Sequence, residues 1–171
     1  QVEINQVRTD FPDKINLEVN VEEKNTGEAS IGAGYSSANA ASLNLGLREN
    51  NFLGKGQKVK FDTSFSNTRT AYDISLTEPY FNNKPLSLTT NLYSNFTDPT
   101  GVNYETEDLG FGISTSFPIS TDRHLELRYS LFTSKIKANS SATVYENALA
   151  GTDTVSSLGY TLVFDRRNSR Y

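Results

Sequence analysis

Few residues of this chain could carry out catalysis with their side chains. His124 is the only histidine among the 171 residues and cysteine is absent, which excludes histidine clusters for a metal, thiolate ligands, disulfides and cysteine nucleophiles. The acidic group Glu105, Glu107 and Asp108 could bind calcium through its oxygen atoms, but it lacks the spaced ligands of a calcium-binding loop. Ordinary solvated charge is therefore the preferred interpretation of these three carboxylates.

The glycines on either side of Phe111 raise a second chemical possibility, a nucleotide site. Gly110 and Gly112 alternate with apolar residues, as in a β-strand, and no Walker-type or dinucleotide-binding glycine motif is present. We therefore predict that the protein is not an enzyme and uses no cofactor and no metal.

The composition indicates neither a nucleic-acid-binding protein nor a helical membrane protein. The formal net charge is −4, from 16 basic and 20 acidic residues, which argues against binding to nucleic acid. No run of about 18 apolar residues exists, so a membrane-spanning helix is excluded. The mean hydropathy of −0.50 is typical of a soluble protein, yet it also fits a membrane barrel, because only one face of each strand meets lipid there.

The elements that must position these residues are predicted to be β-strands, because apolar and polar residues alternate with a period of two. Val59, Phe61 and Phe65 alternate with Lys60 and Asp62 in the clearest run. Several runs last ten or more residues, whereas soluble strands usually have about five or six and tilted membrane-spanning strands need about 9–11. We predict eight strands, at residues 28–36, 40–50, 56–67, 70–78, 85–96, 105–117, 122–137 and 155–167. Their connections are expected to alternate between short and long, as in outer-membrane barrels, but imperfectly, because the link at residues 79–84 is of middling length.

The first 24 residues form a separate unit in the pattern. Apolar residues after Gln1 and a clean alternation from Ile15 to Val21 flank a turn-prone stretch around Pro12, which predicts strand, turn and strand. Residues 25–27 have turn chemistry and mark the expected boundary. The pattern is already under way at the first residue and is still running at Tyr171, so we expect the chain to be a fragment of a longer protein.

Four motifs, in the right order, resemble the BamA-like family of outer-membrane protein assembly factors, in which periplasmic POTRA domains precede a sixteen-stranded barrel. Residues 26–37, with alternating glycines, are similar to the family's first barrel strand. Residues 51–56 match its Asn-Phe-Leu-Gly-x-Gly turn, residues 78–81 match its Glu-Pro-Tyr-Phe segment, and residues 165–168 resemble its Asp-x-Arg element. The turn residues that carry the match are Asn51, Phe52, Leu53, Gly54, Gly56, Glu78, Pro79, Tyr80 and Phe81.

The resemblance implies an all-β fold. Residues 1–24 would be the C-terminal remnant of a POTRA domain, and residues 25–171 the N-terminal half of an antiparallel transmembrane β-barrel. The implied location is the outer membrane of a Gram-negative-type cell, with the N-terminus in the periplasm. The implied function is folding and insertion of other barrel proteins. The partners would be the outer-membrane lipid bilayer, unfolded outer-membrane protein clients and, for the full-length protein, the lipoproteins of the assembly complex.

The first barrel strand is the functional site that the resemblance implies. In the family this strand pairs poorly with the last one and forms a lateral gate, where a client strand is added by β-augmentation. The residues of this strand are Gly27, Ala29, Ile31, Gly32, Gly34, Tyr35 and Ser36. A purely structural alternative is that the glycines only allow the barrel wall to bend. Asp165 and Arg167 could form an ion pair in the lumen, or both could be solvated charges.

Two other classes of function remain open. A transport channel, either porin-like or a relative that secretes a single partner through its lumen, would have the same strands and the same family resemblance. A soluble β-sandwich that serves as a binding module would show the same alternation, but with shorter strands.

Overall fold

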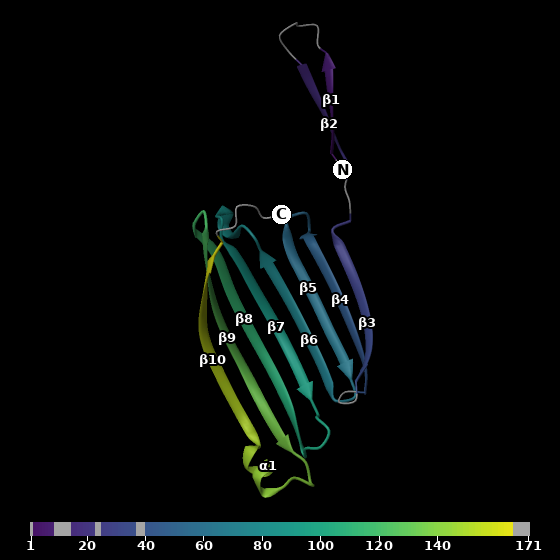
Figure 1. Cartoon of the computed structure of the whole chain (residues 1–171), viewed down its shortest axis with the longest axis vertical. Helices are drawn as coiled ribbons and strands as arrows, with labels where there is room; N and C mark the ends of the chain where they lie inside the picture. Colours follow the sequence, from purple (N-terminus) through teal and green to yellow (C-terminus); the bar gives the residue numbers. More distant parts are fainter. Residues whose placement is uncertain (1, 9–14, 23–24, 37–39, 166–171) are drawn as a thin grey trace.

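The computed structural model describes residues 2–8, 15–22, 25–36 and 40–165 and is almost entirely β-structure (Figure 1). A short antiparallel hairpin of β1 (Val2–Arg8) and β2 (Ile15–Val21) comes first. Eight strands of the described residues then form a single antiparallel sheet. Their bounds are β3 (Gly27–Ser36), β4 (Ala40–Phe52), β5 (Gln57–Ser66), β6 (Arg69–Glu78), β7 (Ser87–Thr97), β8 (Tyr104–Ser120), β9 (Arg123–Ala138) and β10 (Gly151–Phe164).

Two short helical segments interrupt the connections between these strands. They are the 3-10 turn η1 (Phe81–Asn83), which follows β6, and the helix α1 (Val144–Leu149), which lies between β9 and β10. Neither helix in the described part of the chain has the length and apolar character needed to cross a membrane.

Each strand of the sheet is bonded only to the strands that precede and follow it in the sequence. The order across the sheet is β3, β4, β5, β6, β7, β8, β9, β10, so consecutive hairpins make up the whole wall. Within the described residues β3 and β10 are therefore its two edges, and they are not paired with each other. Such an open sheet leaves a row of unpaired main-chain groups along each edge.

The register places most of the large apolar residues of the sheet on one face. Because side chains alternate across a strand and cross-strand partners share a face, one row can be followed from strand to strand. This row consists of Leu47, Phe61, Ile74, Leu92, Phe111 and Leu131. The opposite face carries small and polar residues, among them Ser64, Ser75 and Ser114.

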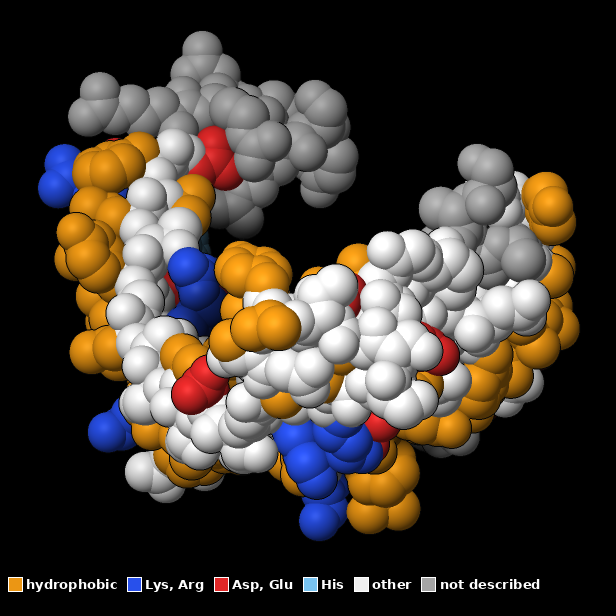
Figure 2. All heavy atoms as spheres, turned by 90° about the horizontal axis from the view of Figure 1, so that it is seen from below, with side chains coloured by type: hydrophobic (Ala, Val, Ile, Leu, Met, Phe, Trp, Pro, Cys, Tyr) orange, Lys and Arg blue, Asp and Glu red, His pale blue; other side chains and the backbone are white. Residues whose placement is uncertain are grey.

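The apolar face is not covered by other parts of the described chain. Among the described residues no hydrophobic side chain is buried, and Leu92 and Leu109 are 55% and 68% exposed. Viewed along the strands, the sheet is an open arc whose hydrophobic side chains gather on its convex outside (Figure 2). A soluble domain does not leave so large an apolar surface in water, whereas the wall of a membrane barrel presents it to lipid. The fold is therefore part of an antiparallel transmembrane β-barrel.

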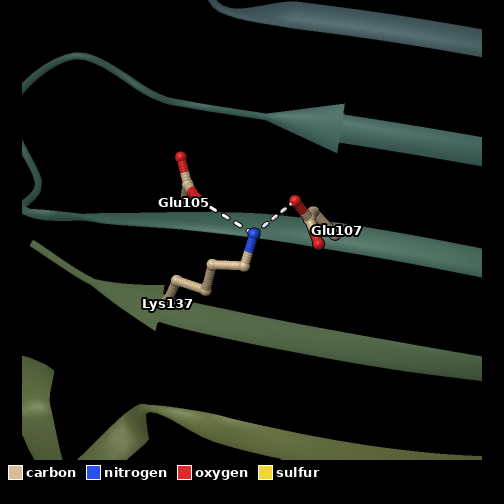
Figure 3. A network of polar contacts seen from close by, with 3 residues as sticks. All are labelled: Glu105, Glu107 and Lys137. Atoms are coloured by element: carbon tan, nitrogen blue, oxygen red, sulfur yellow. Dashed lines mark hydrogen bonds and ion pairs between the residues drawn. The ribbon is translucent and has the colours of Figure 1, made fainter.

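The height of the apolar band agrees with this conclusion. On the outward face of β8 it extends from Leu109 to Phe117, which is about 27 Å along the strand and about 21 Å across a membrane if the strand is tilted by roughly 40°. Charged residues follow directly beyond Leu109. Lys137 Nζ lies 2.5 Å from Glu107 and 3.4 Å from Glu105 (Figure 3), so this ion-pair group marks one rim of the band.

The eight predicted strands are all present, and their ends agree within four residues. The largest difference is at β10, which begins at Gly151 instead of 155. The connections alternate between short and long only imperfectly, as the link of middling length predicted at residues 79–84 indicated. The end of the sheet near the hairpin has both the tight turn 121–122 and the longer loop 79–86, and the far end has both the tight turn 67–68 and the long loop 139–150.

Candidate functional site at the open edge of the sheet

β3 is the edge strand that the sequence identified as a candidate gate. All ten of its residues are exposed. It pairs with β4 in an unbroken register from Gly27, opposite Glu49, to Ser36, opposite Ala40. No other strand of the described residues lies against its second edge. This edge can therefore accept a further strand.

One hydrogen bond at the base of β3 determines which main-chain groups face the open edge. The amide N–H of Asn50 donates to the carbonyl oxygen of Thr26 over 3.2 Å, so these two residues are a hydrogen-bonded pair of the ladder. In an antiparallel ladder such pairs alternate with non-bonded pairs. The even-numbered residues of β3 therefore bond to β4. The odd-numbered residues, which point their N–H and C=O groups to the open side, are Gly27, Ala29, Ile31, Ala33 and Tyr35.

This geometry divides the residues predicted for the gate into two groups. Those with outward main-chain groups are Gly27, Ala29, Ile31 and Tyr35, whereas the main-chain groups of Gly32, Gly34 and Ser36 face β4. Ala33, which the sequence reasoning did not select, belongs with the outward group. The difference follows from the register, which no residue type reveals. The sequence could have indicated the two groups only through the period of two of a β-strand, with every second residue of the segment assigned to the open edge.

The glycines of β3 differ in the space around them, and a Cβ atom added to Gly27 would lie 3.0 Å from the carboxylate of Glu49. A Cβ atom added to Gly32 would have no other atom within 4 Å, and one added to Gly34 would meet only Ser42 Oγ, at 3.2 Å. Both positions lie on the inner face. The side chains of the outward-bonding residues lie on the convex apolar face instead, where Ile31 and Tyr35 are 76% and 83% exposed.

The base of β3 is anchored to the last residues of β4. The Thr26 hydroxyl donates to the carboxylate of Glu49, and the Asn50 side-chain amide donates to the Thr26 carbonyl over 3.1 Å. The same Glu49 carboxylate accepts the amide N–H of Asn51 at 2.9 Å. One end of the edge strand is therefore held by side-chain hydrogen bonds in addition to the ladder.

The turn at residues 51–56 is built as its glycines predict. Asn51 Oδ1 accepts the amide N–H of Gly56 at 2.7 Å and closes the turn. Gly54 and Gly56 have φ of 72° and 70°, a region that favours glycine. Leu53 also has a positive φ, 55°, which the sequence did not indicate and which is strained for a residue with a Cβ.

The segment from Glu78 to Phe81 ends β6 and turns the chain on the outer face. The carboxylate of Glu78 accepts hydrogen bonds from Gln57 Nε2 at 2.8 Å and from the amide N–H of Tyr80 at 3.3 Å. Pro79 has no N–H to continue the ladder. Tyr80 and Phe81 are exposed at the rim of the apolar band, a position that aromatic residues favour in membrane proteins.

The inner face is polar and is connected across strands by hydrogen bonds. Arg69 Nε donates to Asn95 Oδ1 over 2.7 Å, and Asn95 Nδ2 lies 3.4 Å from Asp108 Oδ2, which links β6, β7 and β8. Gly110 leaves room here for Tyr93, because a Cβ at position 110 would be 2.2 Å from the Tyr93 ring and would force that side chain to move. A lumen wall with such side chains fits water rather than lipid.

The other predicted side chains do not form a reactive centre. Glu105 and Glu107 lie on the outer face with Lys137, whereas Asp108 lies on the inner face, so the three carboxylates do not converge. No group of three or more potential metal ligands occurs within the described ranges. The amide N–H of Asp165 donates to the carbonyl of Asp122 at 2.8 Å. Arg167 lies outside the described residues, so its ion pair with Asp165 stays a prediction.

A carboxylate fastens two loops at the end of the sheet opposite the hairpin. Glu146 of α1 accepts from the backbone N–H and hydroxyl of Thr143, both at 2.8 Å, and from the backbone N–H of Asn103 at 2.9 Å. These donors, the backbone N–H of Thr143 first, lower the pKa of Glu146 from 4.5 to about 2. The loop 98–103 is thereby joined to α1, a contact between residues 43 positions apart.

Comparison with known proteins identifies the fold and the family. Residues 51–171 match the Omp85 superfamily domain. The chain is 29% identical over 114 residues to the outer membrane protein assembly factor BamA of Neisseria meningitidis, covering 64% of this chain and 14% of that protein. It is 28% identical over 131 residues to the sorting and assembly machinery component 50 homolog of Homo sapiens, covering 77% of this chain and 28% of that protein.

A solved structure agrees with the observed arrangement of strands. The crystal structure of BamA from Haemophilus ducreyi lacking POTRA domains 1–3 superposes with a TM-score of 0.69 at 22% identity, over 100% of this chain and 36% of that chain. This likeness shows the fold. The chain spans less than a third of the length of the two curated relatives described above.

Proposed function

The chain belongs to the Omp85 superfamily, and we propose that it supplies the first half of the barrel of an outer-membrane protein assembly factor. Residues 25–171 form the barrel wall from its first strand onwards, and residues 1–24 form the end of a POTRA domain in the periplasm. The names of its relatives support this assignment, since they describe an outer membrane protein assembly factor and a sorting and assembly machinery component. The clients are unfolded outer-membrane proteins.

The observation that carries the proposal is the open edge of β3. Five residues of this strand direct both main-chain groups away from β4, which is the arrangement that strand addition requires. Main-chain hydrogen bonds do not depend on the client's side chains, so one edge can serve many sequences. The small side chains of Ala29 and Ala33 leave space on the outer face for whatever residue the client places beside them.

In the membrane, the pairing of another strand with this edge is strongly favourable. A backbone hydrogen bond contributes about 0.5–1.5 kcal/mol net in water, but an amide–carbonyl bond is worth about 4–6 kcal/mol in an apolar medium. An unpaired edge cannot persist in the hydrocarbon region. β3 must therefore pair either with the closing strand of the barrel or with a client strand. Exchange between these two partners is the lateral-gate mechanism of strand insertion.

The N-terminal hairpin supports the assignment of residues 1–24. Val2 lies opposite Val21 and Ile4 opposite Val19 on one face of the hairpin, and all four side chains are exposed. A two-stranded hairpin is marginally stable alone, so this apolar face needs a covering layer, as the end of a larger domain would have. In the complete protein, POTRA domains would also be the docking site for the lipoproteins of the assembly complex.

A proline substitution in β3 of the full-length protein tests the gate directly. Ala33→Pro removes one outward N–H and leaves the bonds to β4 intact, because position 33 does not donate to β4. Ala33→Val changes the side chain but keeps the N–H. We expect Ala33→Pro to reduce the insertion of client barrels into liposomes containing the purified factor, and Ala33→Val to retain it. Equal insertion by the two variants would show that this edge does not pair with clients.

Depletion of the full-length protein in its native cell separates assembly from transport. If many unrelated barrels decline together in the outer-membrane proteome and their precursors accumulate in the periplasm, the assembly function holds. If the other barrels stay normal and a single secreted protein or a solute flux is lost, the chain is part of a secretion or porin-like channel.

A further inference from the structure

A groove lies on the outer face of the sheet, between the turn 51–56 and the loop 79–86. Its volume is about 540 Å³, within the range of small-molecule sites. The lining comes from both connections and from the ends of β5, β6 and β7. It consists of Lys55, Gln57, Leu76, Glu78, Tyr80, Phe81, Asn82, Asn83, Leu88 and Thr90. The proposed gate uses none of these residues.

The floor of the groove is continuous with the surface that meets lipid. Leu76 and Thr90 are cross-strand partners on the outward face, and Leu88 lies on the same face opposite Glu78. Tyr80 and Phe81 stand beside this floor at the rim of the apolar band. A ligand in the groove would therefore contact the apolar floor with one part and lie at the level of the membrane interface with another.

The loop that forms one wall is held by its own backbone. Phe81 N–H donates to the Leu86 carbonyl at 2.8 Å, and Asn83 N–H donates to the Tyr80 carbonyl at 3.0 Å. Asn82 and Asn83 both have a φ of 56°, a conformation that asparagine tolerates better than most residues. The wall is thus formed before a ligand arrives, which lowers the entropy lost on binding.

Two opposite charges line the groove. Lys55 has no ion-pair partner within the part of the chain that the structure describes. Glu78 uses its carboxylate to accept from Gln57 and from the Tyr80 N–H, and a carboxylate has about four acceptor sites. It can therefore accept further N–H donors. A cation and an acceptor anion beside an apolar floor match a zwitterionic lipid headgroup.

We propose that this groove binds a phospholipid whose headgroup carries a phosphate and a primary ammonium group. Lys55 pairs with the phosphate, Glu78 accepts hydrogen bonds from the ammonium, and an acyl chain lies along Leu76 and Leu88. A quaternary ammonium group has no N–H to donate to Glu78, and a headgroup without an ammonium leaves Glu78 facing a negative charge. The proposal rests on the membrane-spanning sheet and not on the assembly function.

Native mass spectrometry of the delipidated full-length protein tests this site. Phosphatidylethanolamine, phosphatidylcholine and phosphatidylglycerol with identical acyl chains are added in equal amounts. We expect phosphatidylethanolamine to be retained about threefold to tenfold more than either of the others. Lys55→Gln should lower its retention about threefold. Glu78→Gln should remove the preference over phosphatidylcholine.

Lys84→Gln is the matched control, because Lys84 is a lysine in the loop 79–86, which forms one wall of the groove, but is not one of its lining residues. It should leave the preference unchanged. Retention without headgroup preference would show an ordinary annular lipid and overturn the proposal. A preference for phosphatidylglycerol would show a general anion site, and equal losses in Lys55→Gln and Lys84→Gln would show a diffuse charge effect. The resistance of the folded barrel to unfolding in gel sample buffer confirms that each variant is folded.

Discussion

The outward face of β7 provides a quantitative test of the membrane assignment. Leu92 lies five residues from each end of the strand Ser87–Thr97 and between Ile74 and Phe111 of the neighbouring strands. The charged residues Glu78 and Glu107 lie opposite Leu88 and Phe96, each four residues from Leu92. Leu92 is thus about 14 Å along the strand from each charged level, or about 10 Å from each rim at a tilt of roughly 40°. This places it at the middle of the apolar band, where an arginine costs about 2–4 kcal/mol.

Two further arginine substitutions act as controls for depth and for face. Leu109→Arg is on the same face but next to the charged rim at Glu107, where the cost should be about 0–1 kcal/mol. Ser75→Arg lies on the inner face, beside Ile74 in sequence but towards the lumen, and should cost less than Leu92→Arg. The free energy of unfolding of the full-length protein, refolded in phospholipid vesicles and titrated with guanidinium, measures all three.

A soluble sandwich and a lipid-facing wall give different results in this series. In a sandwich core the cost of arginine would depend on packing and not on the distance from a membrane rim. If Leu92→Arg and Leu109→Arg have equal costs, or if Ser75→Arg is as damaging as Leu92→Arg, the convex face does not meet lipid. The reasoning from register to membrane would then be refuted.

Three further predictions concern single positions. Gly110→Ala should destabilise the barrel by about 1–3 kcal/mol, because its Cβ would meet the Tyr93 ring, and the cost should shrink when Tyr93→Ala is combined with it in a double-mutant cycle. The pKa of Glu146 falls from 4.5 to about 2 on folding. Its stabilisation of the loops is therefore present above about pH 4.5 and is lost as the pH falls towards 2. Protease cleavage of the loop 98–103 should become faster over that range, and Glu146→Gln should remove this pH dependence. Leu53→Gly should raise the free energy of unfolding by roughly 1 kcal/mol, because glycine adopts the positive φ without strain. A lower free energy of unfolding for this variant in a guanidinium titration would show that Leu53 is not strained.

The strands could be predicted because each has its own signal. A period of two is a local property of the sequence, and it persists across the sheet because one face meets a uniform environment. The start of β10 was missed because Thr152, Asp153 and Thr154 look like loop residues. They form a strand because the β9 ladder extends alongside them, which is information from another part of the chain.

The details of the candidate site needed the register. Whether Gly32 or Ala33 faces the open edge depends on which pairs of the ladder are bonded, and both are small residues suited to a strand edge. The contact between Asn103 and Glu146 likewise joins loops that are distant in sequence. The helix α1 left a readable signal, since Thr143 and Glu146 form a capping box, but six residues are too few for a helical period.

The neighbour-to-neighbour order of the strands has a kinetic consequence. Every pairing from β3 to β10 joins consecutive strands, so the wall can grow one hairpin at a time, and each step closes only a short loop. In the barrel proposed above, joining β3 to a distant closing strand would be different, because it would bring together chain segments separated by the entire wall. That step would have the largest loss of chain entropy and would come last. In the proposed gate, the seam at β3 would thus be the place where an incoming strand competes most easily, since the closing strand would pair there last.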